Sequence, residues 1–536
     1  MGGGRGESDC PQGKIRLSSN LVQFSNLALT SMSTPTAPRV VLKFGGSSVS
    51  SAAGWEAISR LARTRLDVGE KILVVHSALS GITDGLDLLP EEAIAERHLR
   101  LLEGLTKRHH RLALELSLDG PSILREEFAE LRGAAEGIAL TGEVTPRVRA
   151  RILAFGERLS ARIGAAYLRS HGIPVEWLEA GELLTAVTTG RQSGDAVWLS
   201  AECDTELDQD LETRLDTVVG IGLTQGFTAR NKKGETVVLG RGGSDTAAAY
   251  LTGKWGADRL EVWSDVPGMF SADPQVVPSA RLLRRLNYQE AQEIATTGSQ
   301  VLHPRAIRAL RDRGIPIHLK STLDPTAPNT IIDRTENAGP AQVKAISWKR
   351  RVVLVSMETL GMWHEVGFLA RAFSVFHQIG LSVDLVSTSE TNVTVSLDSR
   401  ATRLNQETLD ELETRLSAFC GVRIIQPCAA VSLVGSRIRT MLPRMGPALE
   451  TFEERRVHLV SQAANDLNLT FVVDEDQAPG LVRRLHALLI PDTSESSSLV
   501  FGPSWEDLKS EEPGTSSAQV DAVGRHRPEI LRNPGE

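Results

Sequence analysis

Residues 236–251 read TVVLGRGGSDTAAAYL, and residues 39–48 read RVVLKFGGSS. In both stretches a short run rich in β-branched residues, typical of a buried strand, leads directly into a glycine-rich turn. The first stretch then continues into an alanine-rich segment with helical spacing. Strands that alternate with helices form βαβ units, whose parallel sheet is covered by helices on both faces. The two stretches therefore predict an α/β domain built on an open, mostly parallel sheet.

The same alternation extends along the chain to about residue 319, and we place this domain at residues 39–335. Other strand-like runs lie at residues 71–76, 217–221, 259–263 and 315–319. Helical patterns lie between these runs. One of them contains three histidines that we expect on its solvent-exposed face: His98, His109 and His110.

The pattern changes near residue 351. Residues 350–425 and residues 426–492 each read as strand, helix, strand, strand and helix. Two copies of such a split βαβ unit are typical of a module that binds small molecules or forms dimers.

The ends of the chain, residues 1–38 and 493–536, show no sustained period and are predicted to be disordered tails. Either Met1 or Met32 could be the true start. Within the second tail, only residues 499–508 are apolar enough to dock on the rest of the chain.

The chain has 536 residues, of which 41% are hydrophobic and 24% are charged, so several packed domains are expected. Its net charge is −8, so no basic excess points to nucleic acid or to an anionic membrane as a partner. Apolar runs are strand-sized, well short of a membrane helix. The four cysteines have no CxxC spacing, so no metal site is indicated. We expect a cytoplasmic protein.

The first glycine-rich turn follows Lys43 and contains Gly45, Gly46 and Ser47. Glycines allow backbone N–H groups to approach phosphate oxygens closely. The lysine adds a positive charge where a transferring phosphoryl group builds negative charge. The motif is neither a Walker loop nor GxGxxG, and a tight turn with a surface lysine would look the same.

The second glycine-rich turn contains Arg241, Gly242 and Gly243 and leads to Ser244 and Asp245 at a helix start. A helix N-terminus favours anions and an arginine suits a carboxylate or phosphate, although Asp245 could simply cap the helix. Open α/β sheets bind ligands at the carboxyl ends of their parallel strands, so we expect the two turns to meet there. Phosphoryl transfer fits this pair better than hydrolysis, because the chain has no GxSxG or HExxH motif.

Glu157 lies close to the apolar stripe of its predicted helix, where a carboxylate needs a partner. The ammonium group of a substrate is one candidate, and an internal ion pair with Arg158 or Arg162 is the alternative. Ser77 and Thr83 follow another predicted strand and could hydrogen-bond the same substrate.

Five motifs, in this order, resemble those of the aspartokinases of the amino-acid kinase superfamily. They are KFGGSSV at residues 43–49, FGERLS at 155–160, LGRGGSD at 239–245, EVWSDVPGMFSADP at 261–274 and TGSQVLHP at 297–304. The resemblance covers about residues 40–491, and the paired C-terminal units resemble the tandem ACT domains of the same family. It implies Mg²⁺-assisted transfer of the γ-phosphoryl group of ATP to the β-carboxylate of L-aspartate. This reaction opens the route to lysine and diaminopimelate, threonine and methionine.

The resemblance also implies residue roles. Lys43 would neutralise charge on the moving phosphoryl group, and Asp245 would organise that lysine. Arg241 would clamp a carboxylate of aspartate and Glu157 would bind its ammonium group, in a pocket completed by Ser77, Thr83, Gly242, Gly243 and Ser244. The nucleotide would contact Lys43, Gly45, Gly46, Ser47, Ser264, Asp265, Gln275, Gln300 and, near the adenosine, Phe270. A carboxylate is already a nucleophile, so no strong general base is required.

Two positions depart from the family pattern. Gln275 follows Asp273-Pro274 where many aspartokinases have an arginine, and Gln300 stands where many have a lysine. Each cation could supply about 1.5–3 kcal/mol of charge-assisted hydrogen bonding to phosphate. We expect a raised demand for ATP or an altered metal dependence.

The ACT resemblance implies an allosteric amino acid, either lysine or threonine. The matching effector residues are Met362, Glu365, Phe368, Leu369, Val383, Asp384, Ser389 and Glu390. Asp384 and Glu390 would hold cationic groups, and the helix start near Phe368 would meet a carboxylate. The alternative is that these units only form a homodimer or a higher oligomer.

Two other functions stay open. One is a kinase for another amino acid, such as glutamate or acetylglutamate, and the other is a catalytically silent ACT-type regulatory subunit. Residues 500–505 also resemble the junction found in fused aspartokinase/diaminopimelate decarboxylase proteins.

Overall fold

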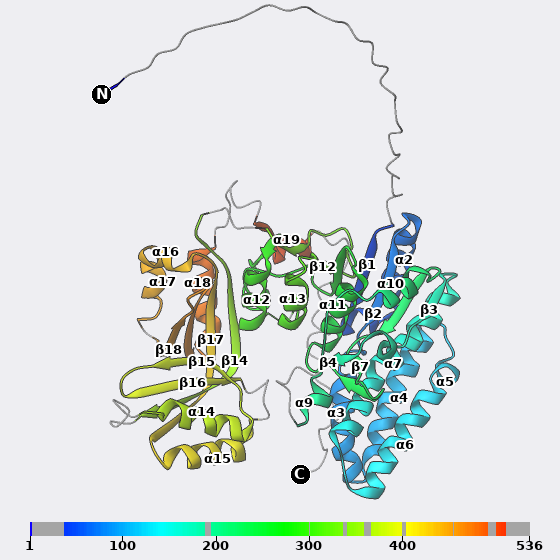
Figure 1. Ribbon diagram of the computed structural model, residues 1–536, viewed down its shortest axis with the longest axis horizontal. Helices are drawn as coiled ribbons and strands as arrows, with labels where there is room; N and C mark the ends of the chain where they lie inside the picture. The colour runs from blue at the N-terminus through cyan, green and yellow to red at the C-terminus, as the bar shows by residue number, and fades with distance from the viewer. Residues whose placement is uncertain are drawn as a thin grey trace, which may run out of the picture. The chain divides into compact units, whose positions relative to one another are not determined.

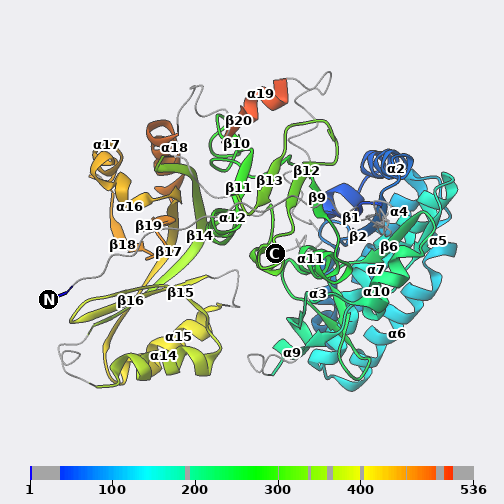
Figure 2. The same ribbon diagram turned by 45° about the horizontal axis from the view of Figure 1, so that its top comes forward.

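An eight-stranded sheet is the framework of the amino-terminal part of the chain. The computed structural model describes residues 1–2, 37–187, 194–299, 301–335, 340–358, 366–398, 404–453, 455–490 and 500–510. The strand order is β11-β13-β12-β9-β1-β2-β6-β3, and all neighbours are parallel except β12 and β13. Figure 2 labels the strands from β11 to β6, and Figure 1 labels β3. The strands are β1 (Arg39–Phe44), β2 (Lys71–His76), β3 (Val175–Trp177), β6 (Ile221–Gln225), β9 (Arg259–Ser264), β11 (Arg285–Asn287), β12 (Ile317–Ser321) and β13 (Thr330–Asp333). The predicted open, mostly parallel sheet is confirmed.

Two predicted strands are placed differently. β6 begins at Ile221, where the predicted run 217–221 ends, because α10 (Gln209–Asp216) occupies the residues before it. The run at 236–239 forms β8 (Thr236–Val238), which pairs with β7 (Thr228–Arg230) in a separate antiparallel hairpin. The second glycine-rich turn therefore does not follow a strand of the main sheet, and that part of the prediction was wrong.

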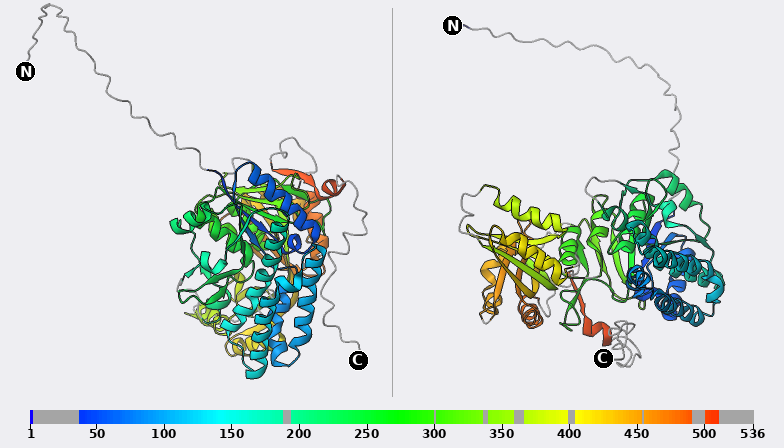
Figure 3. Two further views of the ribbon diagram at one scale, coloured as in Figure 1. Left: turned by 90° about the vertical axis from the view of Figure 1, so that its right-hand side faces the viewer. Right: turned by 90° about the horizontal axis from the view of Figure 1, so that it is seen from below.

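Helices cover both faces of the main sheet (Figure 1; Figure 3, left). One apolar core joins a face to α2 (Ala52–Asp67), α3 (Ile82–Ile94), α4 (His98–Glu115), α6 (Arg125–Thr141) and α7 (Pro146–Ser170). A second core joins the other face to α10, α11 (Gly243–Trp255), α12 (Tyr288–Thr297) and α13 (Pro304–Arg311). Short elements complete this part: α1 (Gly46–Val49), α5 (Gly120–Ile123), α8 (Ala180–Leu183), α9 (Ala196–Leu199), and the two-residue strands β4 (Ala186–Val187) and β5 (Glu202–Cys203). None of the described helices is long and apolar enough to cross a membrane.

The histidines of α4 correct a prediction. His98 and His109 are buried, because α4 packs against α3, α6 and α7 instead of presenting these side chains to solvent. Nδ1 of His109 lies 2.8 Å from the carbonyl oxygen of Leu105, and its ring packs edge-on against Phe128. Burial lowers the pKa of His109 to about 4. These imidazoles are core residues.

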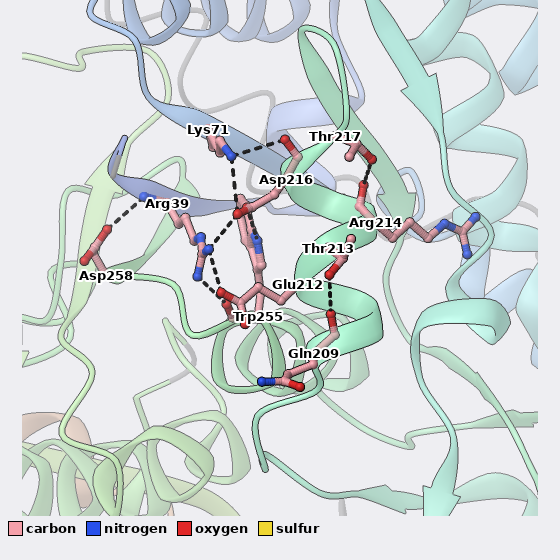
Figure 4. A network of polar contacts seen from close by, with 10 residues as sticks. All are labelled: Arg39, Lys71, Gln209, Glu212, Thr213, Arg214, Asp216, Thr217, Trp255 and Asp258. Carbon is pink, nitrogen blue, oxygen red and sulfur yellow. Dashed lines mark hydrogen bonds and ion pairs between the residues drawn. The ribbon is translucent and has the colours of Figure 1, made fainter. Parts of the chain in front are cut away.

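A polar network ties the amino-terminal ends of β1 and β2 to α10 and α11 (Figure 4). Nη2 of Arg39 lies 2.7 Å from Glu212 and 2.6 Å from Asp216, and the Trp255 indole N–H donates to Asp216 at 3.1 Å. Although burial opposes it, hydrogen bonding to Arg39 holds the pKa of the Asp216 carboxyl below its usual range. The network fixes the edge of the sheet opposite to the carboxyl ends of the strands.

The two split βαβ units share one six-stranded sheet, in the order β15-β16-β14-β17-β19-β18. Its elements are β14 (Gln342–Glu358), α14 (Phe368–Ile379), β15 (Val383–Thr388), β16 (Asn392–Asp398), α15 (Gln406–Ser417), β17 (Gly421–Ser436), α16 (Ile438–Met441), the 3₁₀ helix η1 (Leu442–Arg444), α17 (Gly446–Glu450), β18 (Val457–Gln462), β19 (Asn468–Asp474) and α18 (Ala478–Leu489). The first half of β14 pairs with the second half of β17, for example Trp348 with Val431. Residues 342–349 therefore pair within the later unit, which the predicted boundary at residue 350 missed.

Residues 500–510 lie within the tail that was predicted to be disordered, yet they form β20 (Phe501–Ser504) and α19 (Trp505–Ser510). β20 pairs with β10 (Arg281–Leu283), and both elements are visible together in Figure 2. The Phe501 side chain is buried, and the Trp505 ring packs edge-on against Phe270 at 5.4 Å between centroids. The expectation that residues 499–508 could dock is confirmed, because apolar side chains drive the contact.

Replacing Trp505 by alanine is expected to lower the free energy of unfolding by about 1–3 kcal/mol, since a half-buried aromatic contact is lost. We also expect a raised KM for ATP, because the β9–β10 loop that carries Gln275 loses its support at Phe270. Urea unfolding and nucleotide kinetics measure the two effects. Glu506→Ala, at an exposed position of the same helix, is the control and should leave both unchanged. Equal unfolding midpoints for the Trp505 variant and the wild type would contradict a supporting role.

Candidate active site

The turns that follow β1, β2, β9 and β12 meet at the carboxyl edge of the main sheet. The backbone N–H of Gly45 donates to the Trp263 carbonyl at 2.9 Å, and that of Ser77 donates to the Phe44 carbonyl at 3.2 Å. The hydroxyls of Ser48 and Thr322 lie 2.7 Å apart. Open α/β sheets bind ligands at this edge.

The two glycine-rich turns meet here through an ion pair. Nζ of Lys43 lies 2.5 Å from Oδ1 of Asp245, and both residues are buried. Oδ2 of Asp245 accepts the backbone N–H of His303 at 3.2 Å. At Gly242, whose φ is +64°, a Cβ atom would lie 2.3 Å from Cγ of His303. Glycine is required there because the backbone approaches the His303 ring so closely.

Glu157 of α7 points at the same place. Its side chain is only 4% exposed; Oε1 accepts a hydrogen bond from the Ser244 hydroxyl at 3.3 Å, and Oε2 has no partner among the described residues. Arg158 and Arg162, the alternative partners, pair instead with Glu130 at 3.2 Å and Glu127 at 2.8 Å. Glu157 is thus a buried carboxylate with an unused acceptor oxygen, which favours the interpretation as a ligand-binding group.

The environment of Glu157 changes its titration. Burial raises its pKa to about 7, although nearby backbone groups, the Ser244 hydroxyl and the charge of Lys43 favour the ionised form. A cationic group of a ligand at Oε2 would shift the equilibrium toward the carboxylate.

The other predicted substrate residues surround this point. Ser77 follows β2, Thr83 lies in the first turn of α3, and both are half-buried. Arg241 is exposed. Gly243 packs on Phe227, whose Cδ2 would lie 2.3 Å from a Cβ at that position.

The nucleotide candidates are brought together only in part. Gly46 faces the Ala78 carbonyl so closely that a Cβ would lie 2.9 Å from its oxygen, while Ser47 is half-buried in α1. Ser264 ends β9, and Asp265 and Gln275 are exposed on the loop that follows. Phe270 is buried and packs edge-on against Trp505, and its place near the adenosine stays a prediction. Gln300 lies outside the described residues.

His303 and Phe227 contribute to the site but were not predicted from the sequence. His303 donates its backbone N–H to Asp245, and the Phe227 ring packs against Gly243. Neither contact uses a reactive side-chain group, so the residue types did not indicate a role in the site. The TGSQVLHP motif, which contains His303, was the available clue.

Known proteins are similar to this chain in sequence and in fold. Residues 38–321 match the amino acid kinase family. Aspartokinase 1 of Arabidopsis thaliana, a chloroplastic protein, is 33% identical over 474 residues, which cover 86% of this chain and 82% of the relative. The chain belongs to the aspartokinases. Lysine-sensitive aspartokinase 3 of Escherichia coli K12 is 32% identical, with 84% of this chain and 99% of that relative covered.

The fold is also similar to that of E. coli aspartokinase III in two crystal structures. Its R-state complex with aspartate and ADP superposes with a TM-score of 0.73 at 30% identity, over 84% of this chain and 100% of that one. Its T-state complex with lysine and aspartate gives a TM-score of 0.67 at 29% identity, over 84% and 99%.

In this member of the aspartokinases, the predicted effector residues lie around α14 and β15. Phe368 is buried at the start of α14, and Leu369 next to it is 45% exposed. Val383 is half-buried, whereas Ser389 and Glu390 are exposed. Nζ of Lys349 lies 2.7 Å from Asp384, so this carboxylate already has a cationic partner. Met362 and Glu365 lie outside the described residues.

The raised pKa of Glu157 predicts a pH-dependent KM for the substrate whose ammonium group it binds. Below about pH 7 the free site holds a protonated Glu157, so KM should rise by up to tenfold for each pH unit of acidification and level off above pH 8. Steady-state kinetics with L-aspartate between pH 5.5 and 9 measure this. In the Glu157→Gln variant, KM for L-aspartate should not change with pH over the same range. The same slope in both proteins would assign the titration to another group.

Proposed function

We propose that the chain transfers the γ-phosphoryl group of ATP to the β-carboxylate of L-aspartate, giving 4-phospho-L-aspartate and ADP. The proposal rests on the buried Glu157, whose Oε2 has no partner among the described residues. Its Oε1 accepts a hydrogen bond from the Ser244 hydroxyl, and Ser244 directly precedes Asp245, the ion-pair partner of Lys43. An aspartate ammonium group at Glu157 would leave its β-carboxylate to extend toward Lys43. Membership of the aspartokinases supports this choice of substrate.

The chemistry then depends on electrostatics and positioning. Lys43 stabilises the charge that develops on the phosphoryl oxygens, and Asp245 holds Lys43 at the carboxyl edge of the sheet. Arg241 orients a carboxylate of aspartate, in a turn that α11 positions. No general base is needed, since the attacking carboxylate is ionised at neutral pH.

Mg²⁺ would enter with ATP. Among the described residues no group of three His, Cys, Asp or Glu side chains could hold a metal ion. Mg²⁺ commonly keeps several waters and binds substrate phosphates with only one or two carboxylates. An ion that binds with the nucleotide in this way would neutralise charge on the leaving group.

A substrate panel tests the activity. ADP release should require L-aspartate and should be at least a hundredfold slower with L-glutamate or N-acetyl-L-glutamate, because an extra methylene or a blocked ammonium group cannot satisfy both Glu157 and Lys43. Release with N-acetyl-L-glutamate at the rate seen with L-aspartate would contradict the assignment of Glu157. ATP binding without turnover on any of the three would indicate a silent regulatory subunit.

We also propose feedback inhibition by an amino acid bound at α14 and β15, with lysine and threonine as the candidates. Lys349 bridges Asp384 and Asp398 at 2.7 and 2.9 Å, so the ammonium group of a lysine effector would compete with an internal cation. Coupling to the kinase part runs through α12: Nζ of the buried Lys344 lies 2.8 Å from Glu290, and Asn468 donates to Glu293 at 2.6 Å. Inhibition curves with each amino acid identify the effector.

A homodimer or larger assembly is the expected state of this module. β15 is an edge strand of the six-stranded sheet, with Val386 43% exposed on it. Light scattering on the purified chain measures the mass.

A further inference from the structure

A cavity of about 210 Å³ lies beside the face of α7 that carries Arg151, Phe155 and Arg158. It is bounded by α7, by the end of β6, by the β7–β8 hairpin and by the start of α8, where Gly181 lies. This volume is far above the roughly 10–15 Å³ that one water requires. None of the predicted substrate or nucleotide residues lines it.

The lining is strongly charged. It contains three arginines, Arg151, Arg158 and Arg230, and two glutamates, Glu130 and Glu179. Arg151 and Arg158 both pair with Glu130, at 3.0 and 3.2 Å. The guanidinium of Arg230 has no ion pair or hydrogen bond to any of the described residues. The cavity therefore has one more positive than negative side chain, and its unused cation is Arg230.

Two further side chains, Gln225 and Glu179, could accept additional hydrogen bonds. Gln225 is 2% exposed, its side-chain N–H donates to Glu179, and its Oε1 has no partner among the described residues. The Glu179 carboxylate has that amide as its only hydrogen-bond partner in the described part of the chain. A buried unpaired carbonyl is costly, so a hydrogen-bond donor is expected beside it.

The Arg230 side chain packs against the backbone at Gly181. A Cβ atom at Gly181 would lie 2.6 Å from Cγ and 2.7 Å from Nε of Arg230. The absence of a side chain at Gly181 thus makes room for the guanidinium in the cavity wall.

We propose that this cavity is a second binding site for a small acidic α-amino acid, distinct from the site at Glu157. The α-carboxylate pairs with Arg230, and the ammonium group donates to Gln225 Oε1 and to Glu179. The side-chain carboxylate meets Arg151 and Arg158, two cations that share the single carboxylate of Glu130. A dicarboxylate without an ammonium group would leave Gln225 Oε1 unpaired and would bind less tightly.

The new site is connected to the candidate active site by two segments. Phe155 and Arg158, which line the cavity, flank Glu157 on α7. Gln225 is followed by Gly226, where a Cβ would lie 2.8 Å from Cα of Ser244. Occupation of the cavity is therefore expected to change the KM for aspartate.

Calorimetry with L-glutamate, which is not the proposed phosphoryl acceptor, tests the site on the full-length Glu157→Gln chain, in which binding at the first site is weakened. We expect one equivalent of saturable binding, with at least tenfold weaker affinity for glutarate and for L-lysine. Adding Arg230→Met or Gln225→Met should weaken binding at least tenfold. Gly181→Ala should do the same while keeping every charged group. Arg214→Met removes a comparable surface arginine, paired with Glu182 at 2.9 Å, and should have no effect.

No saturable binding of L-glutamate or L-aspartate, or binding that survives both Arg230→Met and Gly181→Ala, would overturn the proposal. Ordered water alone in the cavity of a crystal soaked with L-glutamate would also overturn it. A shift of the aspartate KM by L-glutamate in the wild type but not in Arg230→Met would support it. These readouts do not depend on the identity of the phosphoryl acceptor, because binding is measured without ATP.

Discussion

Replacing Lys43 by methionine is expected to lower kcat by about a hundred- to a thousandfold, the range seen when one preorganised charged or hydrogen-bonding group is removed from a transition state. Nζ of Lys43 is fixed by Asp245 at 2.5 Å and needs no reorganisation when charge develops on the phosphoryl group. KM for aspartate should change much less, because Glu157 and Arg241 bind the ground state. Initial-rate kinetics on the purified variant measure both constants.

The same change removes one partner of a buried ion pair, which commonly costs about 3–5 kcal/mol of stability. Unfolding curves must therefore accompany the kinetics. Lys254→Met is the matched control, since Lys254 lies on α11, is similarly covered and pairs with Asp204 and Asp208 at 3.2 and 3.3 Å away from the site. It should lose stability while kcat is retained. Equal losses of kcat in both variants would mean that the Lys43 effect is only structural.

Replacing Glu157 by glutamine is expected to raise KM for aspartate by about 10- to 150-fold, since a hydrogen bond to a charged group contributes about 1.5–3 kcal/mol. The effect should be larger at pH 8 than at pH 6, because burial raises the pKa of Glu157 to about 7 and the carboxylate dominates only above that value. kcat at saturating aspartate should fall less than tenfold. Kinetics at the two pH values measure this difference.

Glu127→Gln is the control for Glu157. Glu127 is as deeply buried, on the neighbouring helix α6, but it pairs with Arg162 at 2.8 Å. Its replacement should reduce stability without a specific increase in the aspartate KM. If both variants raise that KM equally, Glu157 does not bind the ammonium group.

The strands of the main sheet could be predicted because their local pattern and their environment agree. β1, β2 and β9 are β-branched runs buried on both faces, which is how parallel strands read in a sequence. β8 has the same composition, but it pairs with β7 outside the main sheet. Composition alone does not specify the partner of a short strand, so the prediction placed it in the wrong sheet.

The meeting of Lys43 with Asp245 was anticipated from two glycine-rich turns, and the expected edge of the sheet was right although one of its strands was not. The sequence could not decide whether Glu157 pairs with Arg158 or Arg162 or binds a ligand. Helical spacing does not show that both arginines pair with glutamates of α6 instead. The burial of His98 and His109 depends on the packing of α4 against α3, α6 and α7. Tertiary packing of this kind leaves no local signature.

Chemical trapping of the product tests the central claim most directly. Acyl phosphates react with hydroxylamine, so the chain incubated with Mg-ATP, hydroxylamine and L-aspartate should form aspartate β-hydroxamate. One hydroxamate should form for each ADP released, and formation should be nearly lost in Lys43→Met. ADP release without hydroxamate, or no reaction from a folded chain that binds ATP, would contradict an aspartate kinase.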